Sequence, residues 1–218
     1  ASVTYIVRVV DTAGNVGTTD TKIVTLDLVK PDLSKEIEIT SISTDSGLNT
    51  TDFLTKDTSL TIHGTVDALE LHEEHAQMSI DGGTTWTTLT VENDGTWRYE
   101  DDRELTDAIY TYHVRVVDTA GNVGYSTSKQ VTVDTIAPDK PAAPTTDQLI
   151  TNNTHPVILI GSVPANEIPE LYINGVKVNS TYDAEDGTLT PVTALTESVY
   201  LIGYTLTDEA GNESEQSN

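Results

Sequence analysis

Apolar and polar residues alternate in short runs along most of the chain. Ile37 to Ile42, Ser59 to Val66 and His113 to Val117 are clear examples. Alternation with a period of two is typical of half-buried β-strands, and the abundant Thr and Val residues favour strands over helices. The only weak candidate for a helix runs from Ala68 to Ala76. The pattern therefore predicts an all-β protein.

An eleven-residue segment occurs twice. Residues 7–17 and residues 114–124 both read VRVVDTAGNVG, and a looser third copy ends in Asp208-Glu209-Ala210-Gly211-Asn212. The equivalent aspartates at positions 11, 118 and 208 are separated by 107 and then 90 residues. Periods of this size suit whole β-sandwich domains of about 100 residues rather than short solenoid repeats.

A second repeated segment follows each of the first two copies. It reads D-x-x-x-P-D at residues 27–32 and again at residues 134–139. Proline stiffens the backbone and interrupts a strand ladder, so these segments are expected to be short, semi-rigid linkers. The expected fold is a tandem array of immunoglobulin-like β-sandwich domains. The predicted parts are the C-terminal hairpin of a truncated Ig-like module at 1–27, a linker at 28–32, a complete Ig-like module at 33–134, a linker at 135–139, and a third Ig-like module lacking most of its last strand at 140–218.

Within the complete module the alternation predicts seven strands. Asn93-Asp94-Gly95 and Asp81-Gly82-Gly83 supply turns between them, because Gly, Asn and Asp accept the backbone conformations that tight turns require. The expected strands, A to G, lie near 36–44, 59–66, 76–80, 86–91, 96–100, 109–117 and 125–133.

Composition narrows the possible partners. Eleven basic residues face 35 acidic ones, which gives a formal net charge of −24. Such a surface repels nucleic acid and anionic membranes and attracts cations or basic partners. The chain has no cysteine, and no apolar run reaches the roughly 20 residues that span a bilayer. We therefore expect no nucleic-acid partner and no membrane insertion by this segment.

Enzyme motifs are absent from the sequence. The five histidines show no H-E-x-x-H zinc spacing, since His72-Glu73-Glu74-His75 has the wrong order and separation. No nucleophile elbow, phosphate-binding glycine loop or Ser-His-Asp arrangement can be identified. The chain is predicted not to be an enzyme.

The D-x-A-G-N turn, the D-x-x-x-P linker and the strand Thr96-Trp97-Arg98-Tyr99 together resemble the bacterial Ig-like modules of giant adhesins exported by type I secretion. The resemblance covers essentially the whole chain and is strongest at residues 1–32 and 93–139. It implies a secreted or bacterial cell-surface location and a role in virulence. It also implies a long, calcium-stiffened rod that joins neighbouring Ig-like modules and carries the bacterium to a host cell-surface receptor or glycan.

Strand topology suggests where calcium ions (Ca²⁺) would bind. The F–G loop, the B–C loop and the preceding linker share one pole of a seven-stranded sandwich, so their acidic side chains should meet at each junction. Calcium takes six to eight oxygen ligands from carboxylates, carbonyls and water. The predicted ligands are Asp27, Asp32, Asp67 and Asp118 at the first junction and Asp134, Asp139, Glu167 and Asp208 at the second.

Two alternatives stay open. The turn aspartates can instead cap their own turns by accepting backbone N–H bonds, which requires no metal. The chain can also be a receptor- or carbohydrate-binding module that uses its divergent third domain as the contact site. The candidate stacking residues are Trp86, Trp97, Tyr172 and Tyr182. A further group of acids at the opposite pole could make an additional ion site, but a solvated acidic surface is the expectation: Asp45, Asp52, Asp81, Asp101, Asp102 and Asp107.

Overall fold

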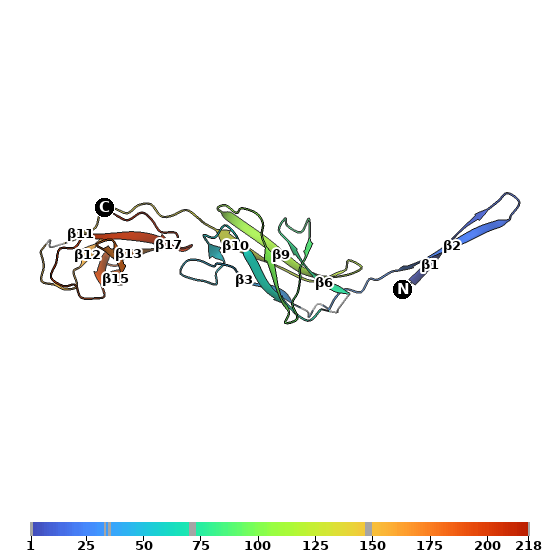
Figure 1. Ribbon diagram of the computed structural model, residues 1–218, viewed down its shortest axis with the longest axis horizontal. Helices are drawn as coiled ribbons and strands as arrows, with labels where there is room; N and C mark the ends of the chain where they lie inside the picture. Colours follow the sequence, from blue (N-terminus) through green and yellow to red (C-terminus); the bar gives the residue numbers. More distant parts are fainter. Residues whose placement is uncertain (1, 33, 35, 70–72, 147–149, 218) are drawn as a thin grey trace. The chain divides into compact units, whose positions relative to one another are not determined.

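The structure is a computed structural model that describes residues 2–32, 34, 36–69, 73–146 and 150–217 (Figure 1). Every regular element within these ranges is a β-strand, so the all-β prediction is confirmed. The predicted helical candidate at 68–76 falls partly outside the described residues, and its last residues belong to strand β6 (Glu74–Ser79). The described part of the chain has no helix that is long and apolar enough to cross a membrane.

The chain divides into two compact units by residue range. Unit 1 comprises Ala1–Glu38, Gly64–Trp97 and His113–Ser128, and unit 2 comprises Ile39–His63, Arg98–Tyr112 and Lys129–Asn218. The strands between residues 37 and 133 form two sheets with the orders β4-β10-β9-β6-β7 and β3-β5-β8. Their bounds are β3 (Ile37–Ile42), β4 (Leu54–Thr55), β5 (Thr61–Val66), β6 (Glu74–Ser79), β7 (Thr87–Thr88), β8 (Thr96–Glu100), β9 (Ala108–Asp118) and β10 (Val123–Val133).

The structure confirms each of the seven predicted strand positions, and it also contains strand β4, which was not predicted. It pairs in parallel with β10, Leu54 opposite Thr132 and Thr55 opposite Val133. Two residues carry too little alternation to predict a strand, so sequence periodicity had no signal for β4. Its pairing covers backbone groups of β10 that would otherwise form an open sheet edge.

Alternating burial along β9 shows how the pattern builds the core. Tyr112, Val114 and Val116 have no exposed surface, whereas the residues between them are only partly buried. Burying an apolar side chain of this size contributes roughly 1.5–3 kcal/mol relative to leaving it in water. The period of two therefore corresponds to one face turned toward the core.

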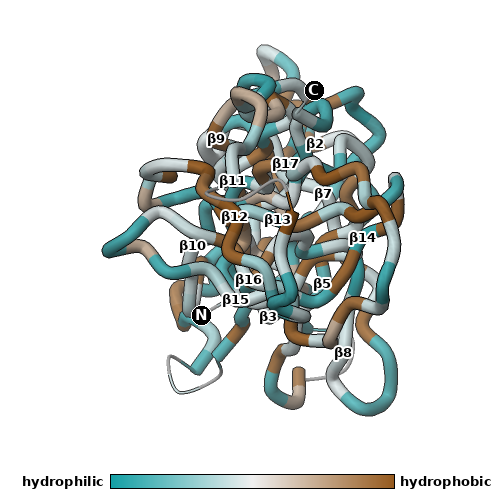
Figure 2. The backbone as a smooth tube through the Cα atoms, turned by 90° about the vertical axis from the view of Figure 1, so that its left-hand side faces the viewer, coloured by the Kyte–Doolittle hydropathy of each residue, from teal (hydrophilic) through white to brown (hydrophobic). Residues whose placement is uncertain are grey.

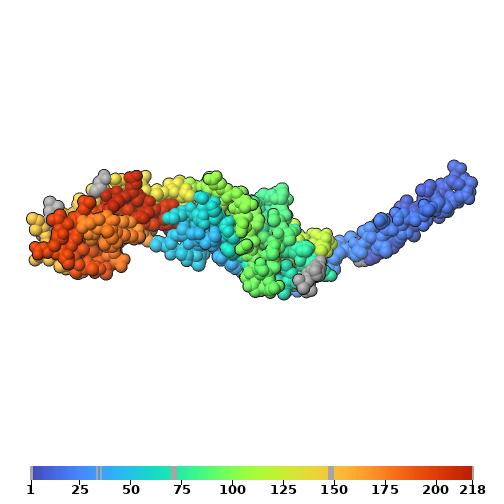
Figure 3. Space-filling model, in the orientation of Figure 1, coloured from blue at the N-terminus to red at the C-terminus, as the bar shows by residue number. Residues whose placement is uncertain are grey.

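The N-terminal hairpin contains the same repeated sequence as β9 and β10 but in a different environment. Strands β1 (Ser2–Val10) and β2 (Val16–Thr25) pair antiparallel with each other and with no other described strand. The sequence equivalents of the buried β9 residues are Tyr5, Val7 and Val9, which are 57%, 69% and 73% exposed. The hairpin, blue in Figure 3, thus presents the apolar face that β9 buries.

The C-terminal part of unit 2 contains a second set of strands and its own core. Two sheets have the orders β11-β12-β16-β15 and β14-β13-β17. The buried core consists of Ile158, Leu171, Ile173, Leu189, Tyr204 and Leu206, and the apolar stretches of β12 and β13 are visible in Figure 2. The bounds are β11 (Thr145–Thr146), β12 (Ile158–Leu159), β13 (Glu167–Ile173), β14 (Val176–Val178), β15 (Ser180–Asp183), β16 (Thr188–Pro191) and β17 (Ile202–Asp208).

Candidate functional site

The D-x-A-G-N turn adopts one hydrogen-bonded geometry in the second copy of the repeat. Asp118 Oδ1 accepts the backbone N–H of Asn122 at 2.8 Å, and Asp118 Oδ2 accepts the Asn122 side-chain amide at 2.8 Å. Gly121 has a φ of 90°, which a residue with a Cβ rarely adopts. The bond from the Asn122 side chain holds the pKa of Asp118 below its ordinary value. The aspartate therefore caps its own turn.

The other two copies repeat this geometry. Asp11 Oδ1 and Oδ2 accept the backbone and side-chain amides of Asn15, each at 2.8 Å. Asp208 accepts the same two groups of Asn212 at 2.8 and 3.0 Å. Turn capping, one of the two alternatives for these aspartates, is what the structure shows in all three copies. A capped carboxylate keeps free lone pairs, so capping does not by itself exclude a metal.

In unit 1 the asparagine of the turn also contacts the linker. Asn122 Nδ2 donates to the backbone carbonyls of Asp27 and Val29, each at 3.2 Å. The linker lies so close to β10 that a Cβ on Gly124 would stand 2.8 Å from Cβ of Pro31. The turn aspartate thus orients the amide that holds the linker backbone.

Unit 2 repeats the same bond. Asn212 Nδ2 donates to the backbone carbonyl of Asp134 at 2.8 Å, and Asn212 is buried. Two further bonds join residues 46–56 to this turn, from Ser46 Oγ to the Ala210 carbonyl at 2.6 Å and from Lys56 Nζ to the Gly211 carbonyl. Asp27 and Asp134 stand at the same position before the two predicted linkers, so the turn asparagine donates to the same acceptor position in both copies.

The other predicted metal ligands have local structural roles. Asp27, Asp32 and Asp134 each accept a backbone N–H from two residues further on, at 2.9 to 3.0 Å. These bonds close Asx-turns that shape the linkers. Asp67 Oδ2 accepts the backbone N–H of Glu36 at 3.0 Å. Glu167 lies opposite Asp208 in the backbone register of β13 and β17, and Asp139 is exposed.

Carbonyl and carboxylate oxygens are the donors that calcium prefers, and both junctions contain them. Within the described ranges, however, no three Asp, Glu, His or Cys side chains are grouped so that they could hold a metal ion. The junctions therefore match calcium in donor chemistry but not in the number of gathered carboxylates. Backbone carbonyls and water would have to complete the shell, and the eight ligands stay a prediction.

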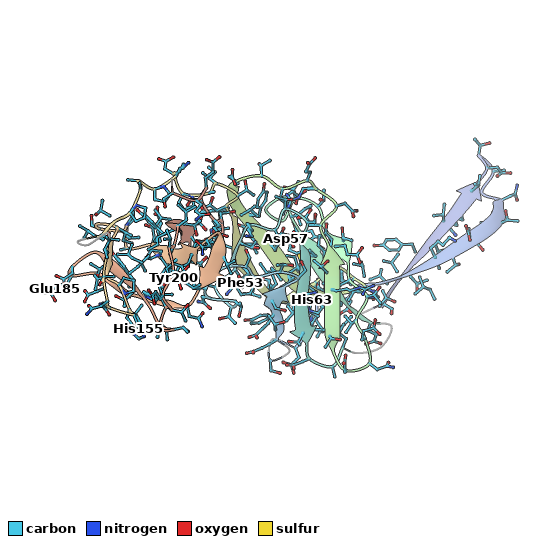
Figure 4. The ribbon with its side chains drawn as sticks, turned by 60° about the vertical axis from the view of Figure 1, so that its left-hand side comes forward. Phe53, Asp57, His63, His155, Glu185 and Tyr200 are labelled. Carbon is cyan, nitrogen blue, oxygen red and sulfur yellow. The ribbon has the colours of Figure 1, made fainter. Side chains whose placement is uncertain are left out.

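One pair from the second acidic group differs from a solvated surface. Asp45 Oδ2 accepts the backbone N–H of Phe53, a residue labelled in Figure 4, at 3.0 Å. The other carboxylate oxygen of Asp45, Oδ1, is buried and has no hydrogen-bond partner among the described residues. Burial raises the pKa of Asp45, and the charge of Asp52 raises it further. Asp45 is half-buried and Asp52 is exposed, and their two carboxylates repel each other, so a cation would relieve this repulsion.

Asp101 also corrects the expectation of a solvated acidic surface, because it is buried. Its carboxylate accepts Arg103 Nε and Nη2 at 2.8 and 2.6 Å and the hydroxyl of Tyr112 at 2.7 Å. Burial opposes ionisation, but the bonds from Arg103 and Tyr112 outweigh it and lower the pKa of Asp101. The sequence pattern places Tyr112 in the core, and a buried tyrosine hydroxyl needs a polar partner. This requirement could have indicated that one of the acids is buried beside Tyr112.

The four candidate stacking residues are placed differently from one another. Trp97 is 3% exposed and belongs to the core, so it offers no ring face to a ligand. Tyr182 packs against the C-terminal core, and Tyr172 donates its hydroxyl to Glu213 at 2.6 Å. Trp86 is half-buried and lines a surface cavity.

Comparison with known proteins identifies one part of the chain. Residues 33–135 match the bacterial Ig-like domain family. The prediction of an immunoglobulin-like fold is therefore confirmed. No curated protein matches the chain.

Solved structures with a similar arrangement include bacterial adhesins. One concerns host cell surface retention of a 1.5-MDa bacterial ice-binding adhesin, with 22% identity and a TM-score of 0.46 over 99% of this chain and 72% of that one. Another is a tetra-tandem repeat in the extending region of a large adhesion protein, with 23% identity and a TM-score of 0.31 over 99% of this chain and 55% of that one. A third holds the FN1–FN3 domains of chicken CNTN1, with 12% identity and a TM-score of 0.45 over 100% of this chain and 73% of that one.

Proposed function

We propose that this chain is a repeat segment of a bacterial surface adhesin, a stalk in which calcium stiffens the junctions between Ig-like modules. The observation that carries the proposal is the repeated asparagine bond. Asn122 and Asn212 occupy the same place in the D-x-A-G-N turn, and each donates to the carbonyl of the aspartate that opens a linker. A bond that recurs at the same position favours a junction built to repeat along a chain.

Domain boundaries follow the same logic in this proposal. The linkers at 28–32 and 135–139 separate the hairpin at 1–27, the module at 33–134 and the module at 140–218. Matching of residues 33–135 to the bacterial Ig-like family supports the central module. The exposed apolar face of Tyr5, Val7 and Val9 supports a hairpin that belongs to a module of the same kind, because its equivalents in β9 are buried.

Calcium would act on electrostatics at the junctions. At a net charge of −24, neighbouring acidic groups repel one another, as exposed Asp52 does with half-buried Asp45. Extracellular calcium modules have dissociation constants of about 10⁻⁴ to 10⁻³ M. At a calcium concentration of about 1 mM, a site at the tighter end gains about 1.4 kcal/mol, enough to bias a hinge roughly tenfold.

The test is small-angle X-ray scattering of the full chain in about 1 mM calcium and in excess chelator, combined with calorimetric calcium titration. We expect calcium binding and a narrower distribution of interatomic distances when calcium is present. Heat changes indistinguishable from dilution would remove calcium from the proposal and leave the asparagine bonds as the only junction contacts.

Charge-neutralising variants locate the ions. Asp134→Asn keeps an acceptor oxygen for Ile136 N–H, and Asp139 is exposed, so Asp134→Asn and Asp139→Asn should both leave the fold intact, but each loses a negative charge. We expect each to weaken calcium binding by about tenfold. Asp20→Asn is the matched control, since Asp20 is exposed in the middle of β2. An equal effect of Asp20→Asn would show that calcium responds only to overall charge.

The finer features of the stalk belong to this proposal as well. They are export by type I secretion, an extracellular or bacterial cell-surface location, a role in virulence, attachment through the full-length protein to a host receptor or glycan, and close kinship to the giant non-fimbrial adhesin of Salmonella. Binding of bacteria that display the chain to cultured host cells, compared with bacteria that lack it, tests the attachment role. The alternative, a contact site in the divergent third domain, predicts that a glycan array responds to changes at Tyr172 or Tyr182.

A further inference from the structure

Outside the junctions, unit 1 contains a surface cavity of about 480 Å³. It lies beside β9 and β10 and is lined mainly by polar residues and one aromatic ring. Its lining includes Gly83, Trp86, His113, Arg115, Ser126 and Ser128. A recess of this size holds a small ligand such as one or two sugar rings.

Arg115 is held in a fixed position within this cavity. Its Nε donates to Gln77 Oε1 at 2.9 Å, and its guanidinium lies 3.9 Å from the centroid of the Trp86 ring. The indole is fixed in turn, because Trp86 Nε1 donates to the carbonyl of Gly83 at 2.9 Å. These contacts occupy one edge and one face of the guanidinium. Its two terminal nitrogens make no hydrogen bond to any other described residue.

Arg115 is partly buried and has no acidic partner within the described residues. Burial is what lowers the pKa of Arg115, and no carboxylate counteracts it. Arg103 and Lys177, which are both exposed, pair with Asp101 and Glu170. A partly desolvated guanidinium without a counter-ion is costly unless an anion completes it.

We infer that this cavity binds an acidic sugar, with the terminal nitrogens of Arg115 pairing with the sugar carboxylate. A guanidinium presents two parallel N–H groups that match the two oxygens of a carboxylate. The hydroxyls of Ser126 and Ser128 offer hydrogen bonds to ring hydroxyl groups, and Trp86 offers an apolar edge. Net negative charge does not prevent this pairing, because salt at about 0.15 M screens charges beyond about 8 Å. The inference goes beyond the proposed stalk role and does not depend on calcium.

The test uses the indole N–H signals of the full chain in a two-dimensional NMR spectrum. Trp86 and Trp97 are the two tryptophans, one at the cavity and one in the core. D-glucuronate and N-acetylneuraminate are titrated as two sources of a sugar carboxylate, with D-glucose as the neutral control. We expect the Trp86 signal to shift with a dissociation constant on the order of 1 mM for at least one acid, while Trp97 stays in place. The acid with the lower dissociation constant identifies which of the two sugars the cavity prefers.

Two variants and a matched control separate the site from general charge. Arg115→Lys keeps the charge but loses the paired N–H groups, and Gln77→Met removes the acceptor that orients Arg115. Each should weaken binding by about tenfold while the Trp97 signal reports an intact fold. Arg8→Lys is the control, because Arg8 is the repeat equivalent of Arg115 but is exposed in the hairpin. No shift with either acid, an equal shift with D-glucose, or an equal loss in Arg8→Lys would overturn the inference.

Discussion

Replacing Asn212 by alanine should loosen the C-terminal half of unit 2. The side-chain amide of Asn212 donates to Asp208 Oδ2 at 3.0 Å and to the Asp134 carbonyl at 2.8 Å. Asn212 and Asp208 are 7% and 8% exposed, so water replaces these bonds poorly. Asn212→Ala leaves a buried carboxylate oxygen and a linker carbonyl without their donor.

The magnitude follows from the two bonds. A hydrogen bond to a neutral carbonyl contributes about 1 kcal/mol, and one to a charged group about 1.5–3 kcal/mol. Asp208 retains the backbone N–H of the turn, which reduces the second loss. The expected cost is therefore about 2–3 kcal/mol. Asn15→Ala removes the same bond to Asp11 but no linker bond, in a fully exposed turn, and should cost less than about 1 kcal/mol.

Native-state hydrogen exchange resolves the two variants, because it reports the opening free energy of individual amides. In Asn212→Ala the amides of β17 should exchange faster by the equivalent of about 2–3 kcal/mol, whereas in Asn15→Ala the amides of β1 and β2 should change little. If the two variants cost the same, or if β17 is unaffected, the linker bond contributes nothing and the junction rests on other contacts.

Two further predictions concern packing and pH. Gly64→Ala would place a Cβ 2.1 Å from Cζ2 of Trp97, so it should lower the free energy of unfolding, measured in urea, by about 3 kcal/mol. Gly17→Ala is the control: its Cβ would have its nearest contact at 3.5 Å, and it should cost less than about 1 kcal/mol. The hydrogen bond to Glu213 raises the pKa of Tyr172 from 10.0 to about 12. Its stabilisation is therefore complete below pH 10 and lost as the pH rises toward 12, and Tyr172→Phe should remove that part of the alkaline decline in the melting temperature.

Strand positions were predictable because they depend on local alternation. Each predicted strand of the 33–134 region overlaps an observed strand, and the interval from 96 to 100 coincides with β8. The short strand β4 was not predictable, since its parallel pairing with β10 depends on residues about 80 positions away. Alternation records which face of a strand is apolar but carries no information on distant partners.

The candidate site was predictable in part. The repeat located the turns and linkers, and turn capping was one of the two alternatives for Asp118. The asparagine bond was missed, because the sequence shows an acidic linker and draws attention to its carboxylates, whereas the observed acceptor is the backbone carbonyl of Asp27. A backbone acceptor is present in every residue and therefore leaves no mark in the sequence.

The repeated segment VRVVDTAGNVG separates what sequence determines locally from what it does not. Both copies form the same hairpin turn with the same aspartate cap, since those bonds lie within the eleven residues. Burial differs completely, with Val7 69% exposed and Val114 buried. Local hydrogen bonds thus fix the hairpin, while apolar contact with other strands fixes the core. It follows that the turn should survive in any variant that keeps Asp, Gly and Asn, whereas burial of the valine face requires the remaining strands of a sandwich.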